Sequence, residues 1–117
     1  MRRTLLTLLP AALLLALPAT VDAQPQRGRQ IAATLDGRYL AGRVAEQDHD
    51  YDAAADQMDA ALVLAPNDPD LIYSAFRMRM YAGRIDAAAQ LAPQVLETRP
   101  GDGFANLVLA VQAVRKG

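Results

Sequence analysis

A pattern of the form Asp-x-x-Tyr-x-x-x-Arg occurs twice in the sequence, from Asp36 to Arg43 and from Asp70 to Arg77. On a helix its three side chains stand at i, i+3 and i+7, so they share one stripe. The tyrosine offers flat contact area with a polar tip, and the arginine offers a planar fork for carboxylates or backbone carbonyls. The pattern predicts a contact surface rather than a reaction centre.

A second cluster, Asp48-His49-Asp50, has the residue types of a metal site. The sequence contains one His and no Cys, so a second histidine or a thiolate cannot complete such a site. We interpret the cluster as a solvated turn between two helices, in which Asp50 caps the second helix. No metal-binding residue is assigned.

A third group, Asp52, Asp56 and Asp59, follows helical spacing and has the residue type of paired catalytic carboxylates. No partner base stands near it in the sequence, and we interpret the group as an exposed acidic face. The sequence also lacks GxSxG, HExxH and a glycine-rich phosphate loop after a strand. We therefore predict that the protein is not an enzyme, with no catalytic residue and no cofactor.

The composition narrows the classes of partner. The 117 residues include 12 basic and 13 acidic side chains, for a net charge of −1. This balance disfavours a nucleic-acid binder, which needs a basic patch or stripe. The chain has no Trp and 5% aromatic residues but is rich in Ala, which favours closely packed helices within one small domain.

The segment 1–23 has the layout of a secretory signal peptide. Arg2 and Arg3 provide a basic start, an apolar run follows from 5 to 17, and Val21-Asp22-Ala23 resembles a cleavage site. The apolar run is shorter than the roughly 20 residues of a membrane span. The alternative is an uncleaved anchor. We predict export to the periplasm or cell envelope of a Gram-negative bacterium, with only transient membrane contact through this segment.

An internal repeat organises the rest of the chain, with segment 35–68 aligned to segment 69–102. The two segments share 11 identities, among them the two Asp-x-x-Tyr-x-x-x-Arg patterns and the pair Pro66 and Pro100. The offset between them is 34 residues, and we call it the repeat period. The apolar periodicity and the turn signals predict five helices. Their expected bounds are Asp36–Asp48, Tyr51–Leu64, Asp70–Tyr81, Asp86–Thr98 and Phe104–Lys116.

This period and its markers resemble the tetratricopeptide repeat (TPR) family. The residues that match the family's small, alanine, large apolar and proline places are Gly42, Ala54, Met58, Ala61-Leu62 and Pro66 in the first repeat, with Gly83, Ala88, Leu96 and Pro100 in the second. The resemblance implies an all-α fold, an α-solenoid of antiparallel helix pairs with about two and a half repeats. Together with the signal peptide at 1–23 and a polar lead at 24–34, it gives the following organisation: 35–68 first repeat, 69–102 second repeat and 103–117 first helix of an incomplete third repeat.

Four residues depart from the family pattern. Arg38 and Ala45 stand where the family often has Trp and Tyr, and Phe76 stands at a place usually held by glycine, which alters the close approach of the helices there. Pro93 lies inside an expected helix, where it leaves the carbonyl of Ala89 without its donor and is expected to kink or split the helix.

In TPR proteins the first helix of each repeat lines the concave face and commonly touches a bound peptide. Carried over, the resemblance implies a groove for a protein or peptide partner lined by Tyr39, Arg43, Glu46, Gln47, Tyr73, Arg77, Met80 and Tyr81. The alternative is intramolecular: Tyr39 and Tyr73 stack between repeats, while the two arginines pair with Asp70 or Glu46.

The last expected helix is apolar nearly all round, whereas a capping helix should be polar on its outer face. Three hypotheses follow. The first is a non-catalytic, exported scaffold that binds a protein segment. The second is an N-terminal TPR module of a larger envelope enzyme or assembly factor, with this chain part of a longer array. The third is self-association through residues 104–116.

Overall fold

The computed structural model describes residues 33–117, and this part of the chain is all helical, as predicted. Its elements are α2 (Leu35–Gln47), α3 (Tyr51–Leu64), α4 (Pro69–Tyr81), α5 (Ile85–Thr98) and α6 (Gly103–Lys116). Each helix begins and ends within one residue of its expected bounds. The predicted signal peptide and nearly all of the predicted polar lead lie outside the described residues.

Helices α2, α4 and α6 each begin at a side-chain cap, and these caps recur at the repeat period. Thr34, Asp68 and Asp102 stand at the N-caps of α2, α4 and α6, and each side chain accepts a backbone N–H of the first turn. Such caps satisfy donors that have no partner inside the helix. Asp50 caps α3 in the same way, with Oδ1 3.1 Å from the Ala53 nitrogen, so its predicted role is confirmed.

The turns inside the helix pairs repeat as well. His49 and Gly83, one repeat period apart, both have a positive φ, of 61° and 76°. After α2, the His49 N–H bonds to the Glu46 carbonyl at 3.1 Å; after α4, the Gly83 N–H bonds to the Met80 carbonyl at 3.0 Å. Glycine adopts this left-handed conformation easily, whereas histidine is strained in it. The Asp48-His49-Asp50 segment is therefore a tight turn, and His49 is its strained residue.

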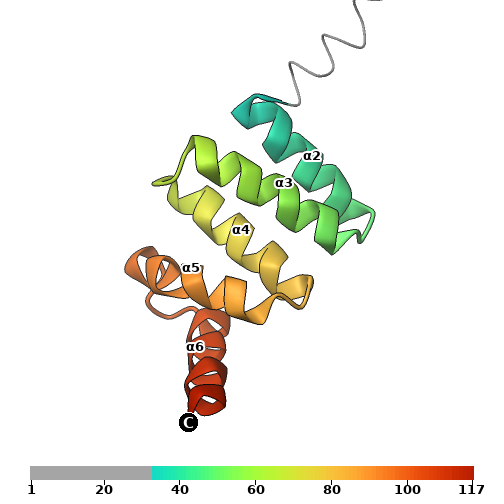
Figure 1. Cartoon of the computed structure of the whole chain (residues 1–117). Helices are drawn as coiled ribbons and strands as arrows, with labels where there is room; N and C mark the ends of the chain where they lie inside the picture. Colours follow the sequence, from blue (N-terminus) through green and yellow to red (C-terminus); the bar gives the residue numbers. More distant parts are fainter. Residues whose placement is uncertain (1–32) are drawn as a thin grey trace, which may run out of the picture.

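Each helix packs mainly on its neighbours in the sequence, so the chain forms a stack from α2 to α6 (Figure 1). From α2 to α5 neighbouring helices run in opposite directions and are joined by short turns, whereas α6 lies at a steep angle to α5 (Figure 1). The core consists of small and apolar side chains from α3, α4, α5 and α6. This is a repeat-like arrangement in which most long-range contacts link adjacent elements, as in repeat proteins generally.

The two helix pairs fill the same core position with opposite combinations of size. A Cβ added to Gly42 would lie 2.8 Å from Cε of Met58, so the missing side chain on α2 makes room for a methionine on α3. The positions one repeat period later hold Phe76 and Ala92, both fully buried. The large residue has moved to the first helix and the small one to the second, which accounts for the departure at Phe76.

Helix α5 runs without a break through Pro93, so of the two expected effects, a kink or a split, the split does not occur. Helices on both sides, α4 and α6, pack against α5. Four of its five buried residues precede Pro93, and Val95 follows it. Burial on both sides of the proline holds the two halves in one helix despite the missing donor.

Candidate functional site

The eight residues expected to line a groove lie on two helices that α3 separates in the sequence. Four are on α2 and four on α4, and we call them together the Tyr–Arg stripe: Tyr39, Arg43, Glu46, Gln47, Tyr73, Arg77, Met80 and Tyr81. Tyr39 and Tyr81 keep 43% and 44% of their surface exposed, whereas Tyr73 and Met80 pack partly against the core. The stripe thus has aromatic surface open to a partner and an inner side that supports it.

Glu46 joins the two helices of the stripe. Its carboxylate pairs with Arg43 on its own helix and, through Oε1 at 3.3 Å, with Nη2 of Arg77 on α4. The Glu46 side chain is only 18% exposed, while Arg43 and Arg77 are 45% and 31% exposed. Two guanidinium groups share one carboxylate, so the group carries a net positive charge, and further N–H donors of the arginines face solvent.

Arg77 lies between two tyrosines of its own helix. Its guanidinium carbon is 5.9 Å from the ring centre of Tyr73 and 5.4 Å from that of Tyr81. Both distances fit cation–π contacts. Tyr81 is the largest cause that raises the pKa of Arg77, with smaller contributions from Glu46 and Tyr73, while partial burial acts in the opposite direction. Arg77 is therefore held in place as a fixed positive charge.

The intramolecular alternative is confirmed for the two arginines, whereas Tyr73 stacks on a residue of its own helix and not between repeats. Arg43 and Arg77 do pair with Glu46. Tyr73, however, stacks on Phe76 of its own helix, with ring centres 6.4 Å apart. Asp70 pairs at 3.5 Å with Arg99 instead of with Arg43 or Arg77. Within the Tyr–Arg stripe, Glu46 therefore holds the two arginines, and Tyr39 is not part of this ion-pair group.

Two residues of the site were not predicted from the sequence. Arg99, after α5, places its guanidinium carbon 3.9 Å from the Tyr73 ring centre. Tyr51, at the start of α3, meets Tyr81 edge-on with ring centres 5.4 Å apart. Their counterparts one period away are Ala65 and Ile85, so the repeat offered no signal for either residue. Both contacts depend on how separate helices pack.

Tyr39 also borders a hollow of about 230 Å³ at the N-terminal ends of α2 and α4. The residues that line it are Leu35, Asp36, Tyr39, Asp68, Asp70 and Leu71. Three of them are acidic and two are apolar. Asp36 and Asp70, the first residues of the two repeated patterns, are therefore brought together beside a tyrosine, at the end of the stripe opposite Glu46.

The acidic group on α3 is exposed at Asp52 and Asp56, as predicted, and its three carboxylates pair with arginines from later in the chain. Arg84 contacts Asp52 at 3.0 Å and Asp56 at 2.7 Å, and these two carboxylates remain 74% and 67% exposed. Asp56 and then Asp52 raise the pKa of Arg84. Asp59 pairs at 2.9 Å with Arg79, which is 14% exposed. Packing of α4 and the next turn supplies these partners.

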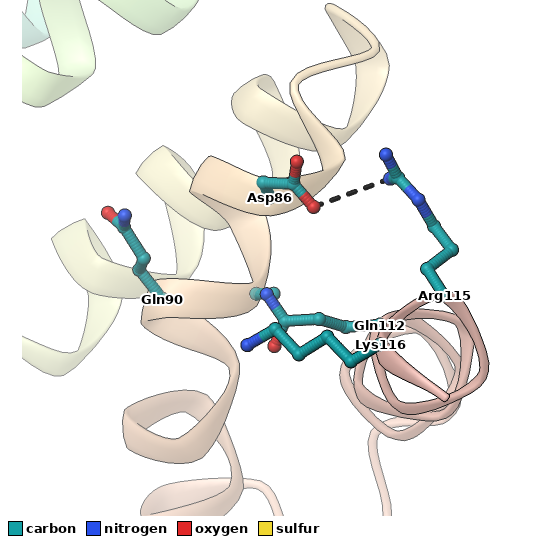
Figure 2. Close-up of a pocket in the computed structure, with 6 residues that line it drawn as sticks. Asp86, Gln90, Gln112, Arg115 and Lys116 are labelled. Carbon is teal, nitrogen blue, oxygen red and sulfur yellow. Dashed lines mark hydrogen bonds and ion pairs between the residues drawn. The ribbon is translucent and has the colours of Figure 1, made fainter.

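A further hollow, of about 530 Å³, lies between α5 and α6. Figure 2 shows Asp86 of α5 facing Arg115 of α6, 3.3 Å apart, with Gln112 and Lys116 extending from α6 toward α5. Both charged groups are more than half exposed. Because the hollow is open and its one carboxylate, Asp86, already pairs with Arg115, it has the features of a helix junction rather than of a ligand pocket.

Comparison with protein-family models, with curated proteins and with solved structures gave no match to this chain. Within residues 33–117, no three or more His, Cys, Asp or Glu side chains gather in a way that could hold a metal ion. None of the helices in the same range has the length and apolar character that crossing a membrane requires.

Proposed function

We propose that this protein is an exported, non-catalytic scaffold that binds a protein segment along the Tyr–Arg stripe of a TPR-like helical solenoid. The main support for the proposal is that two exposed tyrosines lie on the same two helices as two arginines that share the Glu46 carboxylate. Tyrosine and arginine are enriched among the residues that dominate binding energy at interfaces. The recurrence of caps and turns at the repeat period supports the repeat part of the proposal.

The anchored arginines favour a segment with a carboxylate or with open backbone carbonyls. Glu46 fixes the positions of Arg43 and Arg77 before a partner arrives, which lowers the entropic cost of binding. The exposed rings of Tyr39 and Tyr81 lie on different helices and provide contact area on the two sides of this charge. The proposed partner is therefore an extended or helical peptide segment rather than a small molecule.

A display library of random peptides, selected on the full chain, tests the proposal. Binders should lose about tenfold or more in affinity, equal to about 1.4 kcal/mol, when Tyr39→Ser or Arg43→Ala is introduced. Leu40→Ser is the matched control because Leu40 neighbours Tyr39 and is 61% exposed. Equal losses in Tyr39→Ser and Leu40→Ser would place the binding surface elsewhere, and selection that yields no binder would count against a scaffold.

Export is tested separately by the intact mass of the protein in fractionated cells. Cleavage after Ala23 in the sequence would give a periplasmic species that begins at Gln24. A species in the cytoplasmic fraction that still begins at Met1 would overturn the proposed location without affecting the binding surface.

A further inference from the structure

The second repeat holds an arginine side chain against an aspartate and a tyrosine of its first helix. Asp70 and Tyr73 stand three positions apart near the start of α4. Arg99, which follows α5, places its guanidinium carbon 3.9 Å from the ring centre of Tyr73 and its Nη2 3.5 Å from Oδ1 of Asp70. An aromatic face and a carboxylate thus contact the same planar cation, a combination that suits arginine.

The first repeat has the same aspartate and tyrosine but not the arginine. Asp36 and Tyr39 stand at the equivalent places near the start of α2, and the position equivalent to Arg99 is Ala65. Tyr39 is 43% exposed, and Asp36 has no ion-pair partner within residues 33–117. The first repeat therefore presents two parts of a three-part contact.

The backbone at Ala65 has nearly the conformation that it has at Arg99. Its φ and ψ are −143° and 71°, against −133° and 67° at Arg99. The capping residues that follow, Asp68 and Asp102, agree as closely, with −76° and 114° against −67° and 113°. Both turns lie on the same side of the stack (Figure 1). An arginine at position 65 would therefore leave the backbone in the direction that Arg99 takes.

The surface beside Asp36 and Tyr39 is open enough to take a side chain. The hollow of about 230 Å³ at this place is bordered by these two residues, by Asp68 and Asp70, and by two leucines. The leucines suit the apolar stem of an arginine, while the ring and the carboxylates suit its charged head. Each part of an arginine side chain therefore finds a matching surface in the hollow.

The charge of the hollow is negative. Its three carboxylates, Asp36, Asp68 and Asp70, have one cationic partner among the residues that the structure describes, which is Arg99 on Asp70. Acidic residues in a first turn also stabilise a helix by themselves, so the carboxylates alone identify no ligand. Arg99 identifies the ligand, because the protein binds a guanidinium with the same two residue types one repeat later.

We infer that the hollow beside Asp36 and Tyr39 binds the guanidinium of an arginine side chain of the partner segment. The source of this arginine rests on the proposed function, whereas the fit of the hollow does not. Arginine is preferred to lysine because its flat head stacks on the ring while its edge meets the carboxylate. Asp36 and Arg43 are seven residues apart on α2, or about 10 Å, so the negative hollow and the positive arginines orient the bound segment.

Chemical-shift titration of the full chain with N-acetyl-arginine methylamide tests the hollow, because the guanidinium is the only charge of this probe. The probe should shift and saturate the amide signals of residues 35–39 and 68–71, with a dissociation constant in the millimolar range. The neutral citrulline analogue should bind about fivefold or more weakly. Equal affinity of the two probes, or no saturable shift at these amides, would overturn the inference.

Three variants of the chain locate the binding. Asp36→Asn should weaken the probe about fivefold or more, whereas Asp48→Asn, which removes the same charge at the other end of α2, should stay within about twofold. Ala65→Arg should fill the hollow from within the chain and abolish binding of the probe, and the signals of its own side chain should shift upfield over the Tyr39 ring. Circular dichroism checks that the variants fold. Equal affinities of Asp36→Asn and Asp48→Asn, or an Ala65→Arg chain that still binds the probe, would overturn the inference.

Peptides selected on the full chain separate this inference from the proposed function. Replacing the arginine of a selected peptide by citrulline should weaken binding to the wild-type chain about fivefold or more and leave binding to Ala65→Arg unchanged. Peptides that bind the Tyr–Arg stripe without any dependence on arginine would overturn the inference and leave the proposed function in place. Binding of the arginine probe with no peptide selected would support the hollow and overturn the proposed function.

Discussion

At the scale of single residues, the turn at His49 differs from the equivalent turn of the second repeat in residue type but not in backbone conformation. The equivalent turn residue one period later is Gly83, and both have a positive φ. The sequence offered this signal, because position 49 aligns with a glycine at the repeat offset. The histidine drew attention as a metal ligand, whereas its backbone conformation is what distinguishes it.

His49→Gly should raise the free energy of unfolding by about 0.5–1 kcal/mol, because glycine adopts a left-handed conformation without a Cβ clash. Loss of the edge-on contact between His49 and Tyr51, with ring centres 6.0 Å apart, reduces this gain slightly. Urea unfolding measures the change. His49→Ala is the control, since it removes the ring but keeps the strain, and a gain as large as that of glycine would refute the backbone explanation.

At the scale of helices, the bounds of every described element could be predicted because local chemistry fixes them. Asp68 and Asp102 start α4 and α6, and prolines stand near the junctions. Contacts between helices could not be predicted in the same way. Arg79 links α4 to Asp59 of α3 and to the Ala87 carbonyl of α5, yet its counterpart in the first repeat is Ala45, so periodicity gave no indication of this role.

Arg79→Ala should lower the free energy of unfolding by about 2 kcal/mol, because it removes two charge-assisted hydrogen bonds from a largely buried site. Arg84→Ala should cost at most about 0.5 kcal/mol, because exposed ion pairs are weak and screened. Urea unfolding of the two variants provides the comparison. A larger loss for Arg84 than for Arg79 would contradict the assignment of Arg79 as the joint of three helices.

The contribution of Arg84 should not vary with pH near neutrality. Its pKa is raised in the folded chain by Asp56 and Asp52. The pairing is therefore fully present below the unfolded-state pKa and is lost only as pH rises through the higher folded-state pKa, in the strongly alkaline range. Added salt, by contrast, should reduce the small difference between wild type and Arg84→Ala.

At the scale of the whole molecule, stability depends on neighbours along the stack. Helices α3, α4 and α5 each pack between two others, whereas α6 contacts mainly α5. In such quasi-linear proteins the end elements open at lower free energy than the middle ones. The predicted candidate site spans α2 and α4, so its two halves are held together through the packing of α3 and through Glu46.

Hydrogen exchange of the full chain should show the slowest amides in α3, α4 and α5. Amides of α6 should exchange at least about tenfold faster, equal to a difference of about 1.4 kcal/mol in opening free energy. Uniform protection from α2 to α6 would mean that the described residues unfold as a single cooperative unit.

The first repeat combines a small Gly42 with a large Met58, and the second combines a large Phe76 with a small Ala92 at the equivalent positions. This difference has a consequence for descent by gene duplication. Exchange of single helices between the two units would set Gly42 against Ala92, leaving a void, or Phe76 against Met58, overfilling the core; both outcomes destabilise a packed interior. Only a whole helix pair can move between positions without this penalty. A whole helix pair is therefore expected to be the smallest segment that can be exchanged without disturbing this core position.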